Sequence, residues 1–123
     1  MSTWDFSAEI ALRVSNPLNA VRASSRLARS RKTKIERRAG FLLVAASEKP
    51  LPALPVLVRL TRVGPGRMDD EGVVASLKGV RDGVADALKV DDGDRARIRF
   101  EYEQETGRAY AVRVELRGVG SFT

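Results

Sequence analysis

The sequence predicts one domain of the α/β or α+β class, a single sheet of about four strands with two main helices in the order β-α-β-α-β-β. Three observations predict it. Segments near both ends and in the middle alternate polar and apolar residues, while two segments between them show helical apolar spacing. The chain has 123 residues, 43% of them hydrophobic, which suffices for one core rather than two. We therefore expect one domain over residues 1–123.

The first strand is predicted at residues 4–14 because apolar and polar side chains alternate there with a period of two. The apolar set comprises Phe6, Ala8, Ile10, Leu12 and Val14. The stretch "SNPLN" at 15–19 is typical of a turn, which would end this strand.

A long helix is predicted at about 23–46, where apolar residues follow helical spacing. These residues are Ile35, Ala39, Leu42 and Ala46. The first half of this segment is strongly basic and is opposed only by Glu36. Its cations are Arg22, Arg26, Arg29, Arg31, Lys32, Lys34, Arg37 and Arg38.

Three prolines in "EKPLPALP" are expected to end the helix, and a second strand is predicted at 56–63, with Val56, Val58 and Leu60 facing the core. A second helix is predicted at 73–88, after the loop "GPGRMDDEG", because one apolar stripe runs along it. The stripe comprises Val73, Leu77, Val80, Val84 and Leu88. Gly79 and Gly83 interrupt this pattern and would permit close approach of another element.

Two more strands are predicted after the turn "DDGD" at 91–94. Ile98, Phe100 and Tyr102 would face the core from the first of them. The inward residues of the second would be Tyr110, Val112, Val114 and Leu116. The segment "EQETGR" at 103–108 is short and contains glycine, so we expect it to join the two strands as a hairpin.

Composition excludes several kinds of chemistry. The chain has neither cysteine nor histidine, so it can contain no disulfide, thiolate nucleophile or imidazole metal ligand, and no Ser-His-Asp triad. Any chemistry must use Asp, Glu, Lys, Arg, Ser, Thr or Tyr. The N-terminal stretch lacks the basic and apolar regions of a signal peptide, and "FLLVAA" is too short to span a bilayer. We therefore expect a cytoplasmic protein without a membrane segment.

The charge balance points to a polyanionic partner. The formal net charge is +6 and the pI is about 10.3, which favours nucleic acid first and an anionic membrane surface second. A run of charge can also be a solvated helix face. Because the bulky apolar residues follow Ile35, the basic turns have little to insert into lipid, and phosphate binding is favoured. The predicted DNA-binding set comprises Arg22, Arg26, Arg29, Arg31, Lys32, Lys34, Arg37, Arg38 and Arg67.

Acidic residues gather at both ends of the second predicted helix: Asp69, Asp70 and Glu71 before it, and Asp91, Asp92 and Asp94 after it. The first group can act as helix caps, and "DDGD" can be an ordinary turn. However, acids after a helix oppose its dipole, which indicates another role for the second group. If the loops fold back, carboxylates from both could bind Mg²⁺ under a basic surface that recruits DNA.

Lys78 lies about two turns into the second predicted helix and could stabilise charge on a scissile phosphate. The alternative is a solvated lysine paired with Asp82 four residues later. An EF-hand is disfavoured, because "DDGD" lacks the ligand series and the terminal Glu of that loop.

These stretches resemble the RusA-like family of Holliday junction resolvases, especially its divergent phage and prophage members. The likeness runs from "SNPLN" and the basic helix, through "MDDEGVVASLKGVRDGVADALKVDDGD", to "IRFEYEQETG". It covers most of the chain, and the acidic cluster with its following helix is the most specific part. The resemblance implies a small homodimer with a mixed sheet that cuts four-way DNA junctions with Mg²⁺, for which Mn²⁺ substitutes.

By the same resemblance, Asp69 and Glu71 match the acidic pair before the helix, Asp92 the acid after it, and Lys78 the helical lysine. Asp70 is a substitute metal ligand. Family members often have Asp-Asp-Asp-Asn where this chain has Asp-Asp-Glu-Gly at 69–72.

The expected function is therefore a Mg²⁺-dependent endodeoxyribonuclease that resolves branched DNA, with no organic cofactor. The alternative is a protein of the same fold that binds branched DNA or other nucleic acid without cleaving it, which Glu71 and Gly72 motivate. A small RNA-binding or assembly protein is a third hypothesis, resting only on size and charge.

Overall fold

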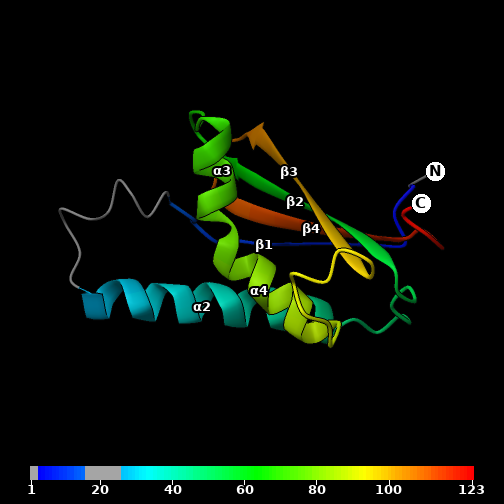
Figure 1. Cartoon of the computed structure of the whole chain (residues 1–123). Helices are drawn as coiled ribbons and strands as arrows, with labels where there is room; N and C mark the ends of the chain where they lie inside the picture. Colours follow the sequence, from blue (N-terminus) through cyan, green and yellow to red (C-terminus); the bar gives the residue numbers. More distant parts are fainter. Residues whose placement is uncertain (1–2, 16–25) are drawn as a thin grey trace.

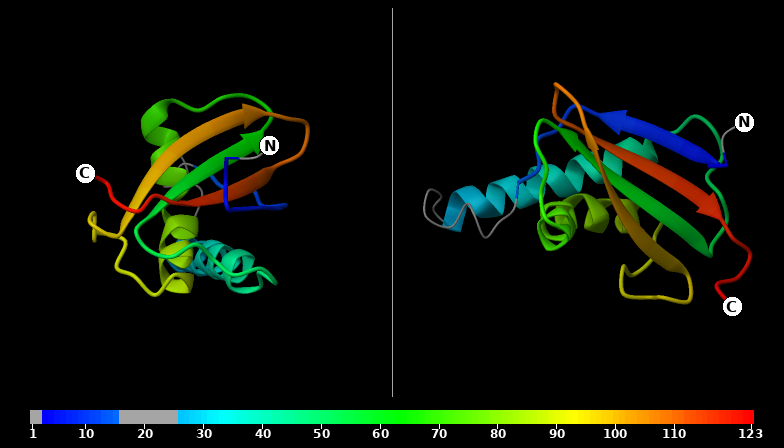
Figure 2. Two further views of the ribbon diagram at one scale, coloured as in Figure 1. Left: turned by 90° about the vertical axis from the view of Figure 1, so that its right-hand side faces the viewer. Right: turned by 90° about the horizontal axis from the view of Figure 1, so that it is seen from above.

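A computed structural model describes residues 3–15 and 26–123 of the chain. It has one mixed four-stranded sheet and three described helices, which confirms the predicted α+β class (Figure 1). The elements in chain order are β1 (Phe6–Ile10), α2 (Arg26–Ala45), β2 (Val56–Gly64), α3 (Asp70–Ser76), α4 (Lys78–Ala87), β3 (Ile98–Thr106) and β4 (Ala111–Gly118). These helices lie on one side of the sheet (Figure 2).

The strand order in the sheet is β1-β4-β2-β3. β2 pairs with β3 in parallel, while β4 is antiparallel to both β1 and β2. The predicted hairpin over 103–108 is therefore wrong, because β2 lies between the two strands that it was to join. The Gly107 N–H donates to the Gly64 carbonyl at 3.1 Å, so the connection passes over the end of β2 and delivers β4 to its other side.

The first strand is shorter than the predicted 4–14. Pairing with β4 runs only from Phe6, opposite Leu116, to Ile10, opposite Val112. The chain then leaves the sheet, although Val14 is still buried in the core. Most of the predicted turn at 15–19 lies outside the described residues.

The core lies between the inner sheet face and the helices. Its fully buried side chains include Val58 and Leu60 from β2 and Val114 from β4. Val73, Leu77, Val80 and Val84 are buried as well, which confirms the apolar stripe predicted for the second helix. Within the described part of the chain, no helix has the length and apolar character needed to cross a bilayer.

The second predicted helix is divided at Leu77 into α3 and α4, which corrects the single helix at 73–88. The Ser76 hydroxyl donates back to the Val73 carbonyl at 2.8 Å, a bond that competes with the backbone ladder and bends helices. Accordingly the Leu77 N–H is shared between the carbonyls of Val73 and Val74, at 3.2 and 3.3 Å. Leu77 itself is fully buried and fixes the bend in the core.

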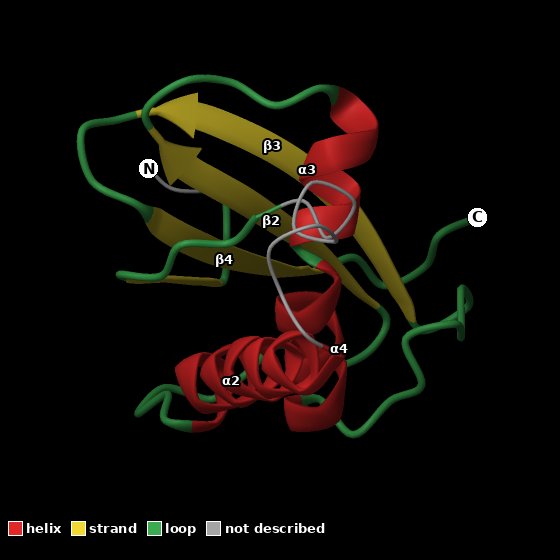
Figure 3. Ribbon diagram, turned by 90° about the vertical axis from the view of Figure 1, so that its left-hand side faces the viewer, coloured by secondary structure: helices red, strands yellow, loops and turns green. Residues whose placement is uncertain are grey.

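α2 packs very closely against α4, which Figure 3 shows beneath the sheet. A Cβ atom on Gly83 would lie 1.9 Å from the Arg37 carbonyl oxygen, and one on Gly40 only 2.4 Å from that of Val80. The expectation that Gly83 permits a close approach is confirmed. Only glycine fits at these two positions, where the two backbones nearly touch.

This close contact decides which face of α2 is buried. The helix is confirmed, but its apolar stripe does not face the core: Ile35 is 61% exposed and Leu42 is 45% exposed. The buried face instead comprises Glu36, Gly40 and Val44.

Candidate nucleic-acid interface and acidic pocket

A polar pocket of about 420 Å³ lies where α2 meets α4. Four of its side chains are carboxylates and two are cations. The lining comprises Arg37, Lys78, Asp82, Ala85, Asp86, Val90, Asp91 and Asp92. The basic helix and an acidic hollow therefore border each other.

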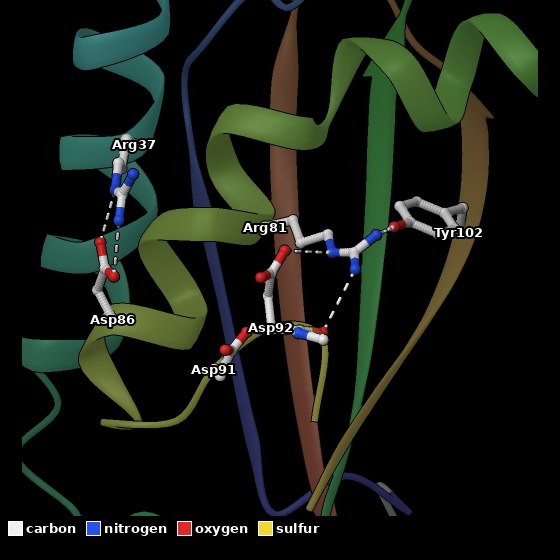
Figure 4. A network of polar contacts seen from close by, with 7 residues as sticks. Arg37, Arg81, Asp86, Asp91, Asp92 and Tyr102 are labelled. Carbon is white, nitrogen blue, oxygen red and sulfur yellow. Dashed lines mark hydrogen bonds and ion pairs between the residues drawn. The ribbon is translucent and has the colours of Figure 1, made fainter. Parts of the chain in front are cut away.

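α4 supplies three of these side chains at intervals of four residues, Lys78, Asp82 and Asp86, which places them on one helix face. Arg37 reaches across from α2 and forms a two-point ion pair with Asp86 (Figure 4): Nε to Oδ2 at 2.7 Å and Nη2 to Oδ1 at 2.9 Å. The hydrogen bonds from Arg37 lower the pKa of the Asp86 carboxyl. This exposed pair bridges the two helices at the rim of the pocket.

Asp82 and Asp92 bring two carboxylates into one place. Burial raises the pKa of the Asp82 carboxyl, and the charge of Lys78 acts in the opposite direction. Asp92 raises the pKa of Asp82 further, through its negative charge and a hydrogen bond between the two side chains. Two acids this close resist simultaneous ionisation unless a proton or a cation lies between them.

Arg81 fixes the position of Asp92 (Figure 4). Its Nε lies 3.4 Å from Asp92 Oδ2, and its Nη2 donates to the Asp92 carbonyl at 3.3 Å. Its Nη1 donates to the Tyr102 hydroxyl at 3.1 Å, and its guanidinium stacks 4.7 Å above the ring of Phe100. The Asp92 loop is thus tied to both α4 and β3.

The other acids of the 91–94 segment shape the turn. Asp91 Oδ1 accepts from the Gly93 N–H at 2.9 Å, and Asp94 Oδ1 accepts from the Ala96 N–H at 3.3 Å. The turn interpretation is confirmed for Asp91 and Asp94. Asp92 differs, because its carboxylate is engaged by Arg81 and Asp82.

The acids before the helix lie elsewhere. Asp69 is the N-cap of α3, where its Oδ1 accepts from the Gly72 N–H at 2.7 Å, so the capping interpretation is confirmed for it. Asp70 and Glu71 are exposed in the first turn, where their charges suit the helix dipole. Asp70 lines a different hollow, of about 290 Å³, which it shares with Arg67.

Lys78 and Asp92 therefore meet in one pocket, whereas Asp69, Asp70 and Glu71 are not part of its lining. In residues 3–15 and 26–123, no three acidic side chains come close enough together to hold a metal ion. The four ligands expected from the sequence do not form one site there. Mg²⁺ commonly takes one or two carboxylates and completes its shell with water and phosphate oxygens, so Asp82 and Asp92 are the candidate ligands at this pocket.

Asp82 and Arg81 are the residues that the sequence did not single out. The spacing of Lys78, Asp82 and Asp86 marks a shared helix face, and that was the available signal for Asp82. No pattern in the sequence marked Arg81, because its partners Asp92 and Tyr102 are 11 and 21 residues away along the chain.

The predicted DNA-binding residues do not all lie on one surface. Arg31, Lys34 and Arg38 are exposed on α2 and form no ion pair with an acid among the described residues. Lys32 donates to the Ser15 hydroxyl, and Arg37 lines the pocket. Arg67 lies by the other hollow, while Arg22 and the side chains of Arg26 and Arg29 fall outside the described part of the chain.

A scan against known protein families finds no match to the chain, and a search of curated proteins finds no similar sequence. The functional conclusion therefore rests on the residues and on the geometry of the pocket and of α2.

Proposed function

We propose that the chain is a Mg²⁺-dependent, structure-selective endodeoxyribonuclease of the RusA-like kind, which hydrolyses phosphodiesters in four-way DNA junctions during recombination, repair or phage DNA processing. One observation carries this proposal: the basic helix α2 borders an acidic pocket, and Arg37 of that helix lines it. A basic surface binds the DNA backbone, and an acidic pocket inside it is a place for a hard cation.

Each part of the pocket has a role in the proposed reaction. Asp82 and Asp92 would hold Mg²⁺, which when bound supplies activation of water and stabilisation of the leaving oxygen. Arg81 keeps the Asp92 carboxylate beside Asp82 through its contacts with the side chain and the backbone of Asp92. Lys78, at the same pocket, can balance charge on a bound phosphate.

The proposal keeps Asp92 and Lys78 from the set implied by the resemblance, and adds Asp82. Asp69 and Glu71 are included in the test below, because the resemblance gives them catalytic roles. A homodimer in the cytoplasm is part of the proposal. A two-fold protein would present one pocket to each of the two related strands of a junction.

The direct test is cleavage of a synthetic four-way junction with and without Mg²⁺, repeated with Mn²⁺. We expect wild type to nick the junction, and Asp92→Asn and Asp82→Asn to lose about 100-fold or more of the rate. Asp94→Asn is the matched control, because Asp94 serves the same turn but does not line the pocket. Equal rates for wild type and Asp92→Asn would reject the site.

The same assay separates the two acidic groups. If Asp69→Asn and Glu71→Gln abolish cleavage while Asp82→Asn leaves it unchanged, the metal lies at α3 and not at α4. If only the α4 and turn variants fail, the pocket described above is the site.

The second candidate is a protein that binds branched DNA without cleaving it. It is favoured by one observation, namely that no three acids converge in the described residues. It predicts tight junction binding that weakens steeply with salt, and no metal-dependent nicking. Reproducible nicking by purified wild type that Asp92→Asn lacks would reject it.

A further inference from the structure

The outer side of α2 carries large apolar side chains in the middle of a cationic surface. Ile35 is 61% exposed and Leu42 is 45% exposed. They lie seven residues apart on one helix face, with Arg38 between them. We call Ile35, Arg38 and Leu42 the outer stripe.

The outer stripe faces away from the core, because the opposite face of α2 is committed to α4. Gly40 and Glu36 lie on that face, and the close backbone contact at Gly40 and Gly83 leaves no room for larger side chains. Burying an aliphatic side chain of this size stabilises a protein by about 1.5–3 kcal/mol. Two that stay in solvent on one helix face indicate an interaction surface.

The charges around the outer stripe restrict its partner. Arg31, Lys34 and Arg38 are exposed there, and the one acidic residue of α2, Glu36, is buried. If a second copy docked through the same stripe, the two-fold axis would bring Arg38 towards its counterpart, with no exposed acid on α2 to neutralise them. A polyanion meets this surface without that repulsion.

The uncovered face of the sheet offers no comparable cationic surface. Its arginines are engaged by acids or by aromatic rings. Arg113 lies 3.2 Å from Glu9 and 2.8 Å from Glu105, and Arg59 lies 3.9 Å from Glu101. Arg99 stacks on the ring of Phe122 and Arg117 on that of Trp4, at 4.4 and 5.1 Å. Among the described surfaces, α2 therefore combines unpaired cations with exposed aliphatic side chains.

We propose that the outer stripe recognises the branch point of DNA: Arg31, Lys34 and Arg38 bind phosphates, while Ile35 and Leu42 pack against base pairs that have lost a stacking neighbour. This inference rests on the proposed function and deepens it. A continuous duplex hides the apolar faces of its bases by stacking, whereas base pairs at a branch expose them. Aliphatic side chains pack against unstacked base steps in other DNA-binding proteins.

The test compares binding of a four-way junction and a linear duplex of the same sequence and length, without divalent cations. Wild type should favour the junction. The double variant Ile35→Gln/Leu42→Gln should lose about tenfold of its junction affinity while its duplex affinity changes less than about twofold. Arg38→Gln should weaken both complexes and reduce the salt dependence of binding.

A second measurement reports contact with bases directly. 2-Aminopurine placed at the branch point should change its fluorescence on binding of wild type and not on binding of the double variant. Val74→Gln is the matched control, because Val74 is a 41% exposed apolar residue on α3, outside the stripe. Its junction preference and fluorescence response should equal those of wild type.

Two outcomes would overturn the inference: a ratio of junction to duplex affinity that is the same in the double variant as in wild type, or a shift from dimer to monomer in sedimentation. Circular dichroism checks that each variant is folded. If the double variant is unfolded, the same comparison is made with the single variant Ile35→Gln. If wild type binds junctions selectively but does not cleave them, the nuclease proposal fails and branch recognition by the outer stripe stands. If the double variant still cleaves junctions selectively, branch recognition by the outer stripe fails and the nuclease proposal stands.

Discussion

Glu36→Gln should make the stability of the protein less dependent on pH. Glu36 is only 8% exposed, and its Oε2 has no hydrogen-bond partner in the described structure. It faces α4, where a Cβ atom on Gly79 would lie 2.9 Å from the Cβ of Glu36. Burial raises the pKa of this carboxyl from 4.5 to about 7, although the charge of Lys32 acts in the opposite direction.

The sign of the effect follows from the raised pKa. Between pH 4.5 and about 7 the folded protein holds a proton on Glu36 that the unfolded chain has released. The free energy of unfolding of wild type is therefore highest below pH 4.5, as far as Glu36 is concerned, and it falls as pH rises to about 7. One unit of pKa corresponds to about 1.4 kcal/mol, so the whole shift corresponds to about 3 kcal/mol. Glutamine has a similar volume and does not titrate.

The assay is urea unfolding of wild type and Glu36→Gln at constant ionic strength between pH 4.5 and 8. The free energy of unfolding of the variant should rise relative to wild type by about 2–3 kcal/mol over that range. Glu103→Gln, a change at an exposed carboxylate on β3, serves as the surface control. A difference between wild type and Glu36→Gln that stays constant with pH would refute the reasoning.

Three further substitutions, one of them a control, test the contact between α2 and α4 and the hydrogen bonds of Gln104. Gly83→Ala places a Cβ atom 1.9 Å from the Arg37 carbonyl oxygen and should cost about 3 kcal/mol or more by forcing α2 from α4, measured by urea unfolding. Gly93→Ala is the control, because a Cβ atom there would lie no nearer than 3.5 Å to its closest neighbour, and it should change stability by less than about 1 kcal/mol. Equal losses of stability in Gly83→Ala and Gly93→Ala would contradict the close contact of α2 and α4. Gln104→Leu removes both bonds from its side chain to the Met68 backbone, at 3.0 and 2.7 Å, and should cost about 1–3 kcal/mol. Amide hydrogen exchange at Met68 should become faster, and unchanged exchange would argue against this role.

Local patterns predicted the elements well, because each depends on a few neighbouring residues. The strand predicted at 56–63 is β2, Val56–Gly64, since the alternation of valine and leucine is readable in the sequence itself. The pairing of strands was not readable in this way. Two strands joined by a short glycine-containing segment look the same whether they pair directly or flank β2, and the parallel pairing of β2 with β3 decides the matter.

The buried face of α2 could not be read from apolar spacing. The residues that pack on α4 include Gly40, selected by the closeness of the two backbones, and Glu36, which is polar. A count of hydrophobic residues finds instead Ile35 and Leu42, which are exposed. Here the tightest packing uses the residues with the weakest apolar signal.

The candidate site was predicted in part. Asp92 and Lys78 do share a pocket, because residues 91–94 turn back along α4. The expected meeting with the acids at 69–71 required α3 and α4 to bring their far ends together. The start of α3 and the end of α4 lie about 25 Å apart along the helical path. The bend at Leu77 does not bring the acids at these two ends close enough to bind one metal ion together, as far as the described residues show.

The position of β4 between β1 and β2 has a consequence for biosynthesis. While the ribosome has delivered only residues before 111, β2 can pair with β3, but the five residues of β1 have no strand to join. The N-terminal segment must therefore wait, with its apolar side chains uncovered, until β4 emerges. In the cell, Phe6 and Ile10 would be the natural targets of a chaperone during that interval.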